Sequence, residues 1–312
     1  MTNSLKEDSR IYTDLQQLKQ FKYYRGQFSF HPLRQATSKK LGRHNSRFRG
    51  QGINFEEYRH YQLGDDVRSL DWRVTLRTGQ PHVRVYSEER EQPVILLIDQ
   101  RLSMFFSSQH TMKSVIAAHI ASLCAWRVIK DGDRVGGLVF NDSDQQWFSA
   151  QRSSKQALQL LSTIHKYNHA LSTENKATDP STTSMRRALN SLEKAKLHGA
   201  LILAFTDGKG FDEQAIRSMQ NLLTKNDVMF FRISDPLEKT LPSHTQFFVS
   251  NGEQQLLLPT HSKLLLDKYK QHNTMLENTL KAKLRMQGSF WCELGTQGSH
   301  IEEFQSVFNR RR

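Results

Sequence analysis

Four short apolar runs, separated by segments of helix length, constrain the fold of this chain more than any other feature of its sequence. They are Val94–Ile98, Val135–Phe140, Ala200–Phe205 and Val228–Ile233. Strands that read as continuous apolar runs are buried on both faces, as in parallel sheets covered by helices. Apolar residues at helical spacing fill the intervals, most clearly over 111–130. The pattern predicts an α/β fold with a mostly parallel, doubly wound sheet.

Composition and cysteine content favour a protein of the cytoplasm. In 312 residues no apolar run approaches the ~20 residues that a membrane-spanning helix requires. Residues 1–14 alternate polar and charged side chains and lack the apolar core of a signal peptide. The two cysteines, Cys124 and Cys292, lie far apart in the sequence. This indicates free thiols in a reducing compartment, so we expect a cytoplasmic location.

The formal net charge of +13 is concentrated near the start of the chain. Residues 1–54 contain eleven Lys and Arg against three acids, and a second basic cluster lies at 310–312. Such an arm can bind nucleic acid, an anionic lipid surface or an acidic protein, or it can simply keep the protein soluble. The most basic stretch, 39–49, has Phe48 as its one aromatic residue, which gives little support for base stacking.

Composition and periodicity divide the chain into four segments. Residues 1–52 are a basic arm with a short helix predicted over 14–24, and residues 53–92 are rich in aromatic and charged side chains. Residues 93–258 alternate strands and helices, and residues 259–312 are a terminal helix and tail. The α/β domain is therefore expected in the third segment.

Two of the four predicted strands end in an aspartate, Asp99 and Asp207. In an open α/β sheet, ligands bind beyond the carboxyl ends of the strands. Two carboxylates at that edge can hold a hard divalent cation when hydroxyls and waters complete the oxygen shell. The same aspartates can instead cap the helices that follow. In either case the loops after these strands, here called the rim, are the candidate site.

The segment 94–233 resembles a von Willebrand factor A domain. The metal-ion-dependent adhesion site of that family combines an Asp-x-Ser-x-Ser turn, a threonine and a further aspartate. The resemblance places these groups on Asp99, Ser103, Thr183 and Asp207. The middle serine of the turn is Arg101, whose guanidinium cannot ligate a metal and can pair with either aspartate in place of the cation. We therefore expect no cofactor, with Mg²⁺ at these four residues as the alternative.

Residues 49–90 carry a longer pattern, R-G-x-G-x-x-F-x-E-x-R-x-Y-x-x-G-D-D-x-R-x-x-D-W followed by an arginine. It resembles the signature of a widespread bacterial family, the domain of unknown function number fifty-eight. The matching positions are Arg49, Gly50, Gly52, Phe55, Glu57, Arg59, Tyr61, Gly64, Asp65, Asp66, Arg68, Asp71, Trp72 and Arg77. Leu76 departs from the pattern, where the family more often has a small residue. With the A-like domain, the resemblance covers about residues 45–235.

The signature suggests an electrostatic clamp. Aspartates in and after the Gly64 turn can face neighbouring arginines, and Trp72 can supply an apolar anchor. The residues assigned to the clamp are Arg59, Asp65, Asp66, Arg68, Asp71, Trp72, Arg73 and Arg77. Such a network can hold the segment onto the flank of the sheet, or it can form a docking surface for a partner.

The resemblance implies a partner more than a reaction. Genes of this family commonly lie beside those for MoxR-type AAA+ ATPases and other A-domain proteins. No phosphate-binding loop, G-x-S-x-G elbow, H-E-x-x-H helix or paired C-x-x-C appears in the sequence. We therefore expect a non-enzymatic scaffold or adaptor that acts with such an ATPase, and with other A-domain proteins, in the assembly or maturation of a protein complex. Its partner-binding residues at the rim are expected to be Asp99, Arg101, Ser103, Thr183 and Asp207. The alternatives are nucleic-acid or anionic-surface binding through the basic arm, and a metal-dependent hydrolase at the strand-end carboxylates.

Overall fold

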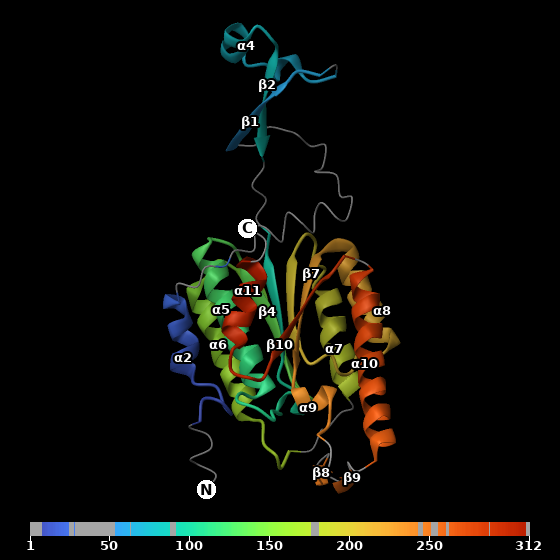
Figure 1. Cartoon of the computed structure of the whole chain (residues 1–312). Coiled ribbons are helices and arrows are strands. Elements are labelled where there is room, and N and C mark those ends of the chain that lie inside the picture. The colour runs from blue at the N-terminus through green and yellow to red at the C-terminus, as the bar shows by residue number, and fades with distance from the viewer. Residues whose placement is uncertain are drawn as a thin grey trace. The chain divides into compact units, whose positions relative to one another are not determined.

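The computed structural model describes residues 8–24, 28, 54–62, 64–87, 92–175, 181–242, 246–250, 255–259, 262–286 and 288–309. The chain divides into two compact units, one of residues 1–37 with 92–312 and the other of residues 38–91. They are called the α/β unit and the signature unit, and Figure 1 labels most helices and several strands of the two units.

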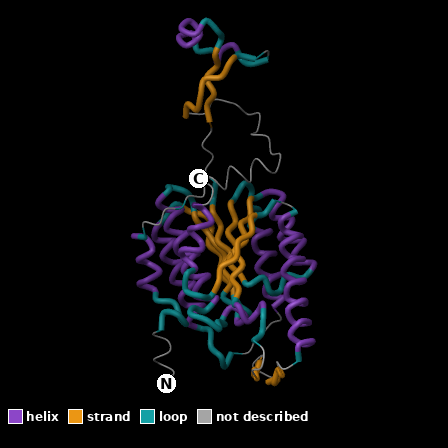
Figure 2. The backbone as a smooth tube through the Cα atoms, in the orientation of Figure 1, coloured by secondary structure: helices purple, strands orange, loops and turns teal. Residues whose placement is uncertain are grey.

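A six-stranded sheet forms the centre of the α/β unit. Figure 2 shows its strands lying between two groups of helices. Its strands are β3 (Val94–Asp99), β4 (Val135–Phe140), β5 (Gln145–Gln151), β6 (Leu201–Thr206), β7 (Asp227–Ser234) and β10 (Phe290–Gly295). Their order is β10-β7-β6-β3-β4-β5, and neighbours are parallel except for β4 and β5, which are antiparallel. Chain order reverses between β3 and β6, as it does at the switch point of a doubly wound sheet. The predicted fold class is confirmed.

Helices cover both faces of this sheet (Figure 1). One face carries α2 (Leu15–Gln20), α5 (Lys113–Lys130), α6 (Ser154–His169) and α11 (His300–Asn309); the other carries α7 (Ser181–Lys194), α8 (Glu213–Lys225) and α10 (Lys263–Arg285). The helix predicted over 14–24 is thus α2, which a 3₁₀ turn, η1 (Phe21–Tyr23), extends. Trp126 of α5 ties α2 to this layer by donating its indole N–H to the carbonyl of Leu18, at 3.0 Å.

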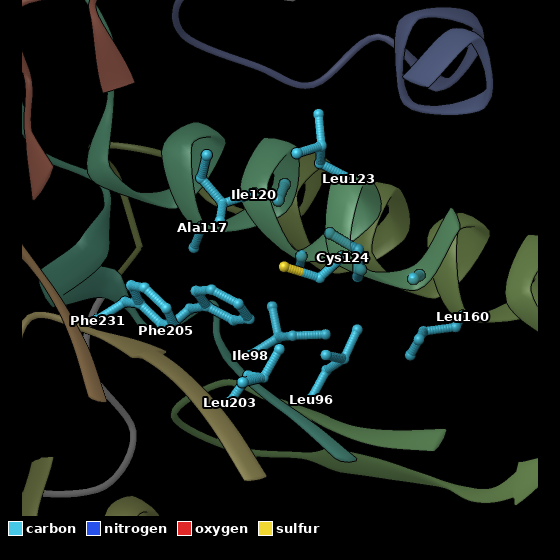
Figure 3. Packing of buried hydrophobic residues seen from close by; sticks show 14 of the residues in the cluster. Leu96, Ile98, Ala117, Ile120, Leu123, Cys124, Leu160, Leu203, Phe205 and Phe231 are labelled. Atoms are coloured by element: carbon cyan, nitrogen blue, oxygen red, sulfur yellow. The ribbon is translucent and has the colours of Figure 1, made fainter. Parts of the chain in front are cut away.

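Alternation along the strands divides the apolar side chains into two cores. Leu96 and Ile98 of β3 point to α5, where they meet Ile120 and Cys124, and all four side chains are fully buried (Figure 3). Ile95 and Leu97, which alternate with them along β3, point to the opposite face and pack with α7, α8 and α10. Burying each large aliphatic side chain contributes about 1.5–3 kcal/mol. Cys124 is a free cysteine, as the sequence indicated.

The sheet extends beyond the predicted domain boundary at residue 258. After α10 the chain forms β10, which pairs with β7, and then α11, whose Phe304 and Phe308 are buried against the first core. The terminal segment therefore supplies a strand and a helix to the α/β unit. Two short strands, β8 (Gln246–Ser250) and β9 (Gln255–Pro259), pair with each other in a separate antiparallel sheet.

The signature unit is a small hairpin with helical turns between its strands. Its elements are β1 (Asn54–His60), η2 (Val67–Ser69), α4 (Trp72–Thr78) and β2 (His82–Ser87), and β1 and β2 are antiparallel. Val74 of α4 and Val83 of β2 are its buried apolar residues among those described. Gly79 ends α4 in the left-handed conformation, with φ +72°. Strand β1 and helix α4 were not predicted from the sequence.

Several sequence-based expectations lie outside the described residues. They include the basic stretch 39–49, the cluster at 310–312, and the signature positions Arg49, Gly50 and Gly52. That the signature segment packs on the sheet stays a prediction. Within the described ranges, no helix combines the length and the apolar character that crossing a bilayer requires.

Candidate functional site

The two strand-end aspartates lie where the order of the sheet reverses. Asp99 ends β3 and Asp207 follows β6, and these strands are direct neighbours. Both side chains are buried. The parallel arrangement brings two carboxylates, about a hundred residues apart in sequence, to one edge of the sheet, as the rim interpretation expected.

Arg101 occupies the space beside Asp99. Its guanidinium forms a bidentate ion pair, with Nε 2.9 Å from Oδ1 and Nη2 2.6 Å from Oδ2 of the carboxylate. Its backbone N–H also donates to Oδ1, at 3.0 Å. Burial alone would lower the pKa of Arg101, but the charge of Asp99 outweighs it and raises that pKa. The internal ion pair considered in place of a cation is therefore present.

The remaining guanidinium hydrogens point to backbone oxygens and to the second aspartate. Nη1 donates to the carbonyl of Ser181 at 2.8 Å, and Nη2 donates to that of Lys209 at 2.9 Å. Nη2 also lies 3.7 Å from Oδ1 of Asp207. Gly210 permits this packing, because a Cβ there would lie 2.2 Å from the Ser181 carbonyl and 2.9 Å from Nη1 of Arg101.

Lys113, the first residue of α5, neutralises the other side of Asp207. Its buried Nζ lies 3.2 Å from Oδ2 of Asp207 and 2.7 Å from Oε1 of Glu238. Lys209 also contacts Glu238, at 2.9 Å. Burial opposes ionisation of Asp207, but the charges of Lys113 and Arg101 outweigh it and hold the pKa of that carboxyl well below its usual range.

Sequence reasoning missed Lys113, although one signal was available. The residue opens a long apolar helix, where a positive charge is disfavoured by the helix dipole. A lysine in that place points to a carboxylate that compensates for it. Glu238 carried no such signal, because it lies on the four-residue helix α9 (Pro236–Lys239), far away in sequence.

The hydroxyl residues of the rim have different surroundings. Ser103 lies on η3 (Leu102–Met104), and its Oγ is buried without a hydrogen-bond partner among the described residues. Thr183 lies in the first turn of α7 with its side chain exposed. The hydroxyl that contacts Asp99 comes instead from Thr206, which donates to Oδ2 at 2.7 Å. The structure thus brings together the two aspartates and Arg101, but it does not bring Thr183 to them.

The residues in this arrangement do not fit a metal ion. Asp99 is engaged by a guanidinium through both oxygens, and Asp207 lies between that guanidinium and an ammonium group. A divalent cation here would stand beside two fixed positive charges in a buried place, where repulsion is poorly screened. Across the ranges that the structure describes, no group of three or more His, Cys, Asp and Glu side chains is arranged to hold a metal.

The signature unit has a second network of arginines and aspartates. Arg59 reaches Asp65 through one nitrogen, which lies 2.8 Å from each carboxylate oxygen. Asp65 also accepts the backbone N–H of Gln62, which closes the turn. Asp66 caps η2 by accepting the N–H of Arg68. These aspartates hold the connection between β1 and α4.

Asp71 holds the helix of the signature unit in place. It caps α4 by accepting the N–H groups of Arg73 and Val74, and it accepts a hydrogen bond from Nε of Arg84 on β2, at 2.7 Å. The Arg84 contact lowers the pKa of Asp71 to about 2. Arg84 was not among the predicted clamp residues; it lies on β2, thirteen positions after Asp71 in the chain.

Other clamp residues are exposed at the surface of this unit. Trp72 is 63% exposed and Leu76 is 84% exposed, and they lie four residues apart on α4. Arg68, Arg73 and Arg77 are exposed as well. None of these three arginine side chains pairs with an aspartate in the described part of the chain, and Trp72 is not an internal anchor of the unit. The expected clamp therefore divides into a structural network and an exposed surface, here called the α4 surface: Arg68, Trp72, Arg73, Leu76 and Arg77.

Sequence and structure comparisons relate the chain to other proteins. Uncharacterized proteins of Mycobacterium tuberculosis (strain H37Rv) and Mycobacterium bovis are 26% identical to it over 212 residues, which are 68% of this chain and 64% of theirs. The chain thus spans less than two thirds of these relatives. Among solved structures, the conserved hypothetical protein BatB from Bacteroides thetaiotaomicron is similar (TM-score 0.43, 13% identity, 70% of this chain and 98% of that one). A von Willebrand factor type A protein from Catenulispora acidiphila is also similar (TM-score 0.36, 11% identity, 74% and 44%).

The strand order and the two helix layers of this chain identify its fold as von Willebrand factor A-like. The model of the family described as "Protein of unknown function DUF58" matches residues 57–278. That range is more than half of the chain, and it takes in most of the signature and the α/β unit as far as α10. The chain therefore belongs to the family of proteins of unknown function DUF58.

Proposed function

We propose that this protein is a non-enzymatic adaptor that binds an acidic protein partner through the α4 surface. The observation that carries the proposal is the pair of exposed apolar side chains, Trp72 and Leu76, flanked by arginines without an internal partner among the described residues. The aspartates around them hold the fold of the unit, so the arginines are available to a carboxylate-rich surface.

The chemistry of this surface matches that of protein-binding sites. Tryptophan and arginine are the residues most often found to dominate interface energetics. Trp72 and Leu76 form one stripe of α4, and Arg73 and Arg77 form the next stripe, also four residues apart. A helix side that offers an apolar stripe beside a basic one suits a partner with an apolar pocket and an acidic border.

The α/β unit supports a binding role over a chemical one. The buried carboxylates of Asp99 and Asp207 at the rim are paired with Arg101 and Lys113, so neither of these two is presented as a reactive acid or base. We infer that this unit is the scaffold of the adaptor. For the partner we propose a MoxR-type AAA+ ATPase, because genes of the DUF58 family commonly lie beside those for such ATPases.

The experiment measures binding of the purified full chain to a purified MoxR-type AAA+ ATPase encoded in the same genome, by interferometry at low and moderate salt. Trp72→Ala should weaken binding by roughly 30-fold, the effect of a hot-spot residue worth about 2 kcal/mol. The charge reversal Arg73→Glu should slow association and reduce its salt dependence. Leu264→Ala and Arg217→Glu are matched controls, because both residues are exposed on other helices of the α/β unit.

Two results would count against the adaptor. In the first, the ATPase does not bind, or binds the Trp72→Ala variant as tightly as the natural sequence. In the second, the chain binds duplex DNA with a steep loss at higher salt, and Trp72→Ala has no effect. That result would favour nucleic-acid binding through the basic arm.

A further inference from the structure

The side chain of Arg101 is enclosed by oxygen atoms. Its three guanidinium nitrogens contact both carboxylate oxygens of Asp99 and the backbone carbonyls of Ser181 and Lys209, at 2.6–2.9 Å. A further oxygen, Oδ1 of Asp207, lies 3.7 Å away. Carboxylate and carbonyl oxygens are the types of ligand that a hard divalent cation takes in proteins, with water completing the shell. Here they surround an organic cation that belongs to the chain.

The enclosure is complete and closely fitted. The Arg101 side chain is 0% exposed, and its guanidinium carbon lies 5.4 Å from the centre of the Phe140 ring. Gly210, in the left-handed conformation, brings its backbone against the guanidinium. The site is therefore closed around the guanidinium, and a second cation cannot enter without displacing Arg101.

Charge is also balanced without an added ion. The acids Asp99, Asp207 and Glu238 face the bases Arg101, Lys113 and Lys209, so opposite charges are equal in number within this cluster. The carboxylate of Asp142, which accepts the backbone N–H of Leu102, borders it. Adding a dication to the cluster would leave an excess of positive charge in a place with little access to solvent.

We propose that Arg101, assisted by Lys113, is the permanent internal cation of this rim and holds it in a single state that is independent of divalent metal. The oxygen cage around the guanidinium is competent to bind a divalent cation once Arg101 is shortened. The rim of the natural sequence is thus insensitive to chelators, whereas that of an Arg101→Ser variant depends on Mg²⁺ or Ca²⁺.

The test compares thermal unfolding and calorimetric titration of the full chain with EDTA, Mg²⁺ or Ca²⁺. For the natural sequence we expect no change in midpoint and no heat of binding. Arg101→Ser should unfold at a lower temperature in EDTA, because Asp99 loses its counter-charge. Saturating cation should raise the midpoint of this variant by roughly 5 °C or more, with one ion bound.

The controls locate the effect in the cage. Arg101→Ser combined with Asp99→Asn should lose the response to cation. Arg186→Ser removes an arginine that also pairs with an aspartate, Asp212, but that pair is partly exposed, so no cation response should appear. Arg101→Lys retains a positive charge and should remain insensitive to metal.

Two outcomes would overturn the proposal. One is a midpoint of the natural sequence that rises with Mg²⁺ or Ca²⁺ and no longer does so after Asp99→Asn. The other is an Arg101→Ser variant that binds no cation. Should that variant be unfolded as purified, it is refolded from urea with and without Ca²⁺, and failure to fold in both conditions also refutes the proposal.

Discussion

Replacing Lys113 by methionine should be among the most destabilising single substitutions in this protein. The side chain is 0% exposed and its ammonium lies between Asp207, at 3.2 Å, and Glu238, at 2.7 Å. Methionine fills nearly the same volume, so packing is largely kept and the lost charge dominates. The variant leaves the buried carboxylate of Asp207 and the half-buried carboxylate of Glu238 without the ammonium group that lies between them.

The magnitude follows from what each carboxylate keeps. Breaking a buried ion pair by removing one partner costs about 3–5 kcal/mol. Asp207 keeps the backbone N–H of Lys209, at 2.9 Å, and the Arg101 guanidinium, at 3.7 Å. Glu238 keeps the Lys209 ammonium, at 2.9 Å. These contacts place the loss of unfolding free energy near the lower end, about 3 kcal/mol. For a chain of 312 residues that corresponds to a fall in the thermal midpoint of roughly 5 °C.

The assay is urea unfolding followed by near-ultraviolet circular dichroism at several pH values, with Lys209→Met as the matched control. Lys209 contacts the same glutamate, but its side chain is 54% exposed, so its loss should cost less than about 1 kcal/mol. In the natural chain the pKa values of Asp207 and Glu238 are lowered, so the stability they contribute is present at neutral pH and is lost in acid. The difference between the natural chain and Lys113→Met should therefore narrow as pH falls and the carboxylates of the variant take up protons. Equal losses for the two lysine variants at pH 7 would refute this reasoning.

Two further predictions concern a glycine and a histidine pair. Gly210→Ala places a Cβ 2.2 Å from the Ser181 carbonyl at a residue with φ +82°. Gly199→Ala has no such contact and loses only about 1 kcal/mol through backbone strain at φ +67°, so Gly210→Ala should lower the unfolding free energy by clearly more. Equal urea midpoints for the two variants would contradict this. His119 and His300 contact each other at 3.1 Å, and burial lowers their pKa values to about 3 and about 4. Because the unfolded chain takes up these protons near pH 6.5, stability should fall between pH 6.5 and 5 by about 2 kcal/mol per histidine, and His119→Gln should reduce that slope. An unchanged slope would show that other groups control the acid sensitivity.

The sheet and its switch point were predictable because buried parallel strands leave a direct trace in the sequence. Runs such as Val94–Ile98 are apolar at every position, and the aspartates at the ends of β3 and β6 then fall at one edge of the sheet. The ion pair of Asp99 with Arg101 could be considered because the two residues are neighbours in the chain. Local sequence was sufficient for this half of the site.

The rest depended on contacts that no local pattern records. Lys113 meets Glu238 across 125 positions, through the placement of a four-residue helix. Strand β1 is polar along most of its length, and a two-stranded hairpin of that kind has no apolar run to mark it. The division of the signature into structural and exposed arginines required Arg84 on the facing strand, which satisfies Asp71 and leaves Arg73 and Arg77 at the surface.

The position of β10 has a consequence for how the protein is made. This strand pairs along β7, yet it is synthesised only after the long helix α10, so the β7 edge emerges from the ribosome well before its neighbour. An open strand edge is a template for pairing with other chains. During that interval the nascent protein carries an exposed edge, and the delay sets a window for misassembly. Ribosome-bound chains halted before residue 290 should therefore be more dependent on chaperones than the released full chain, in which β10 can pair with β7.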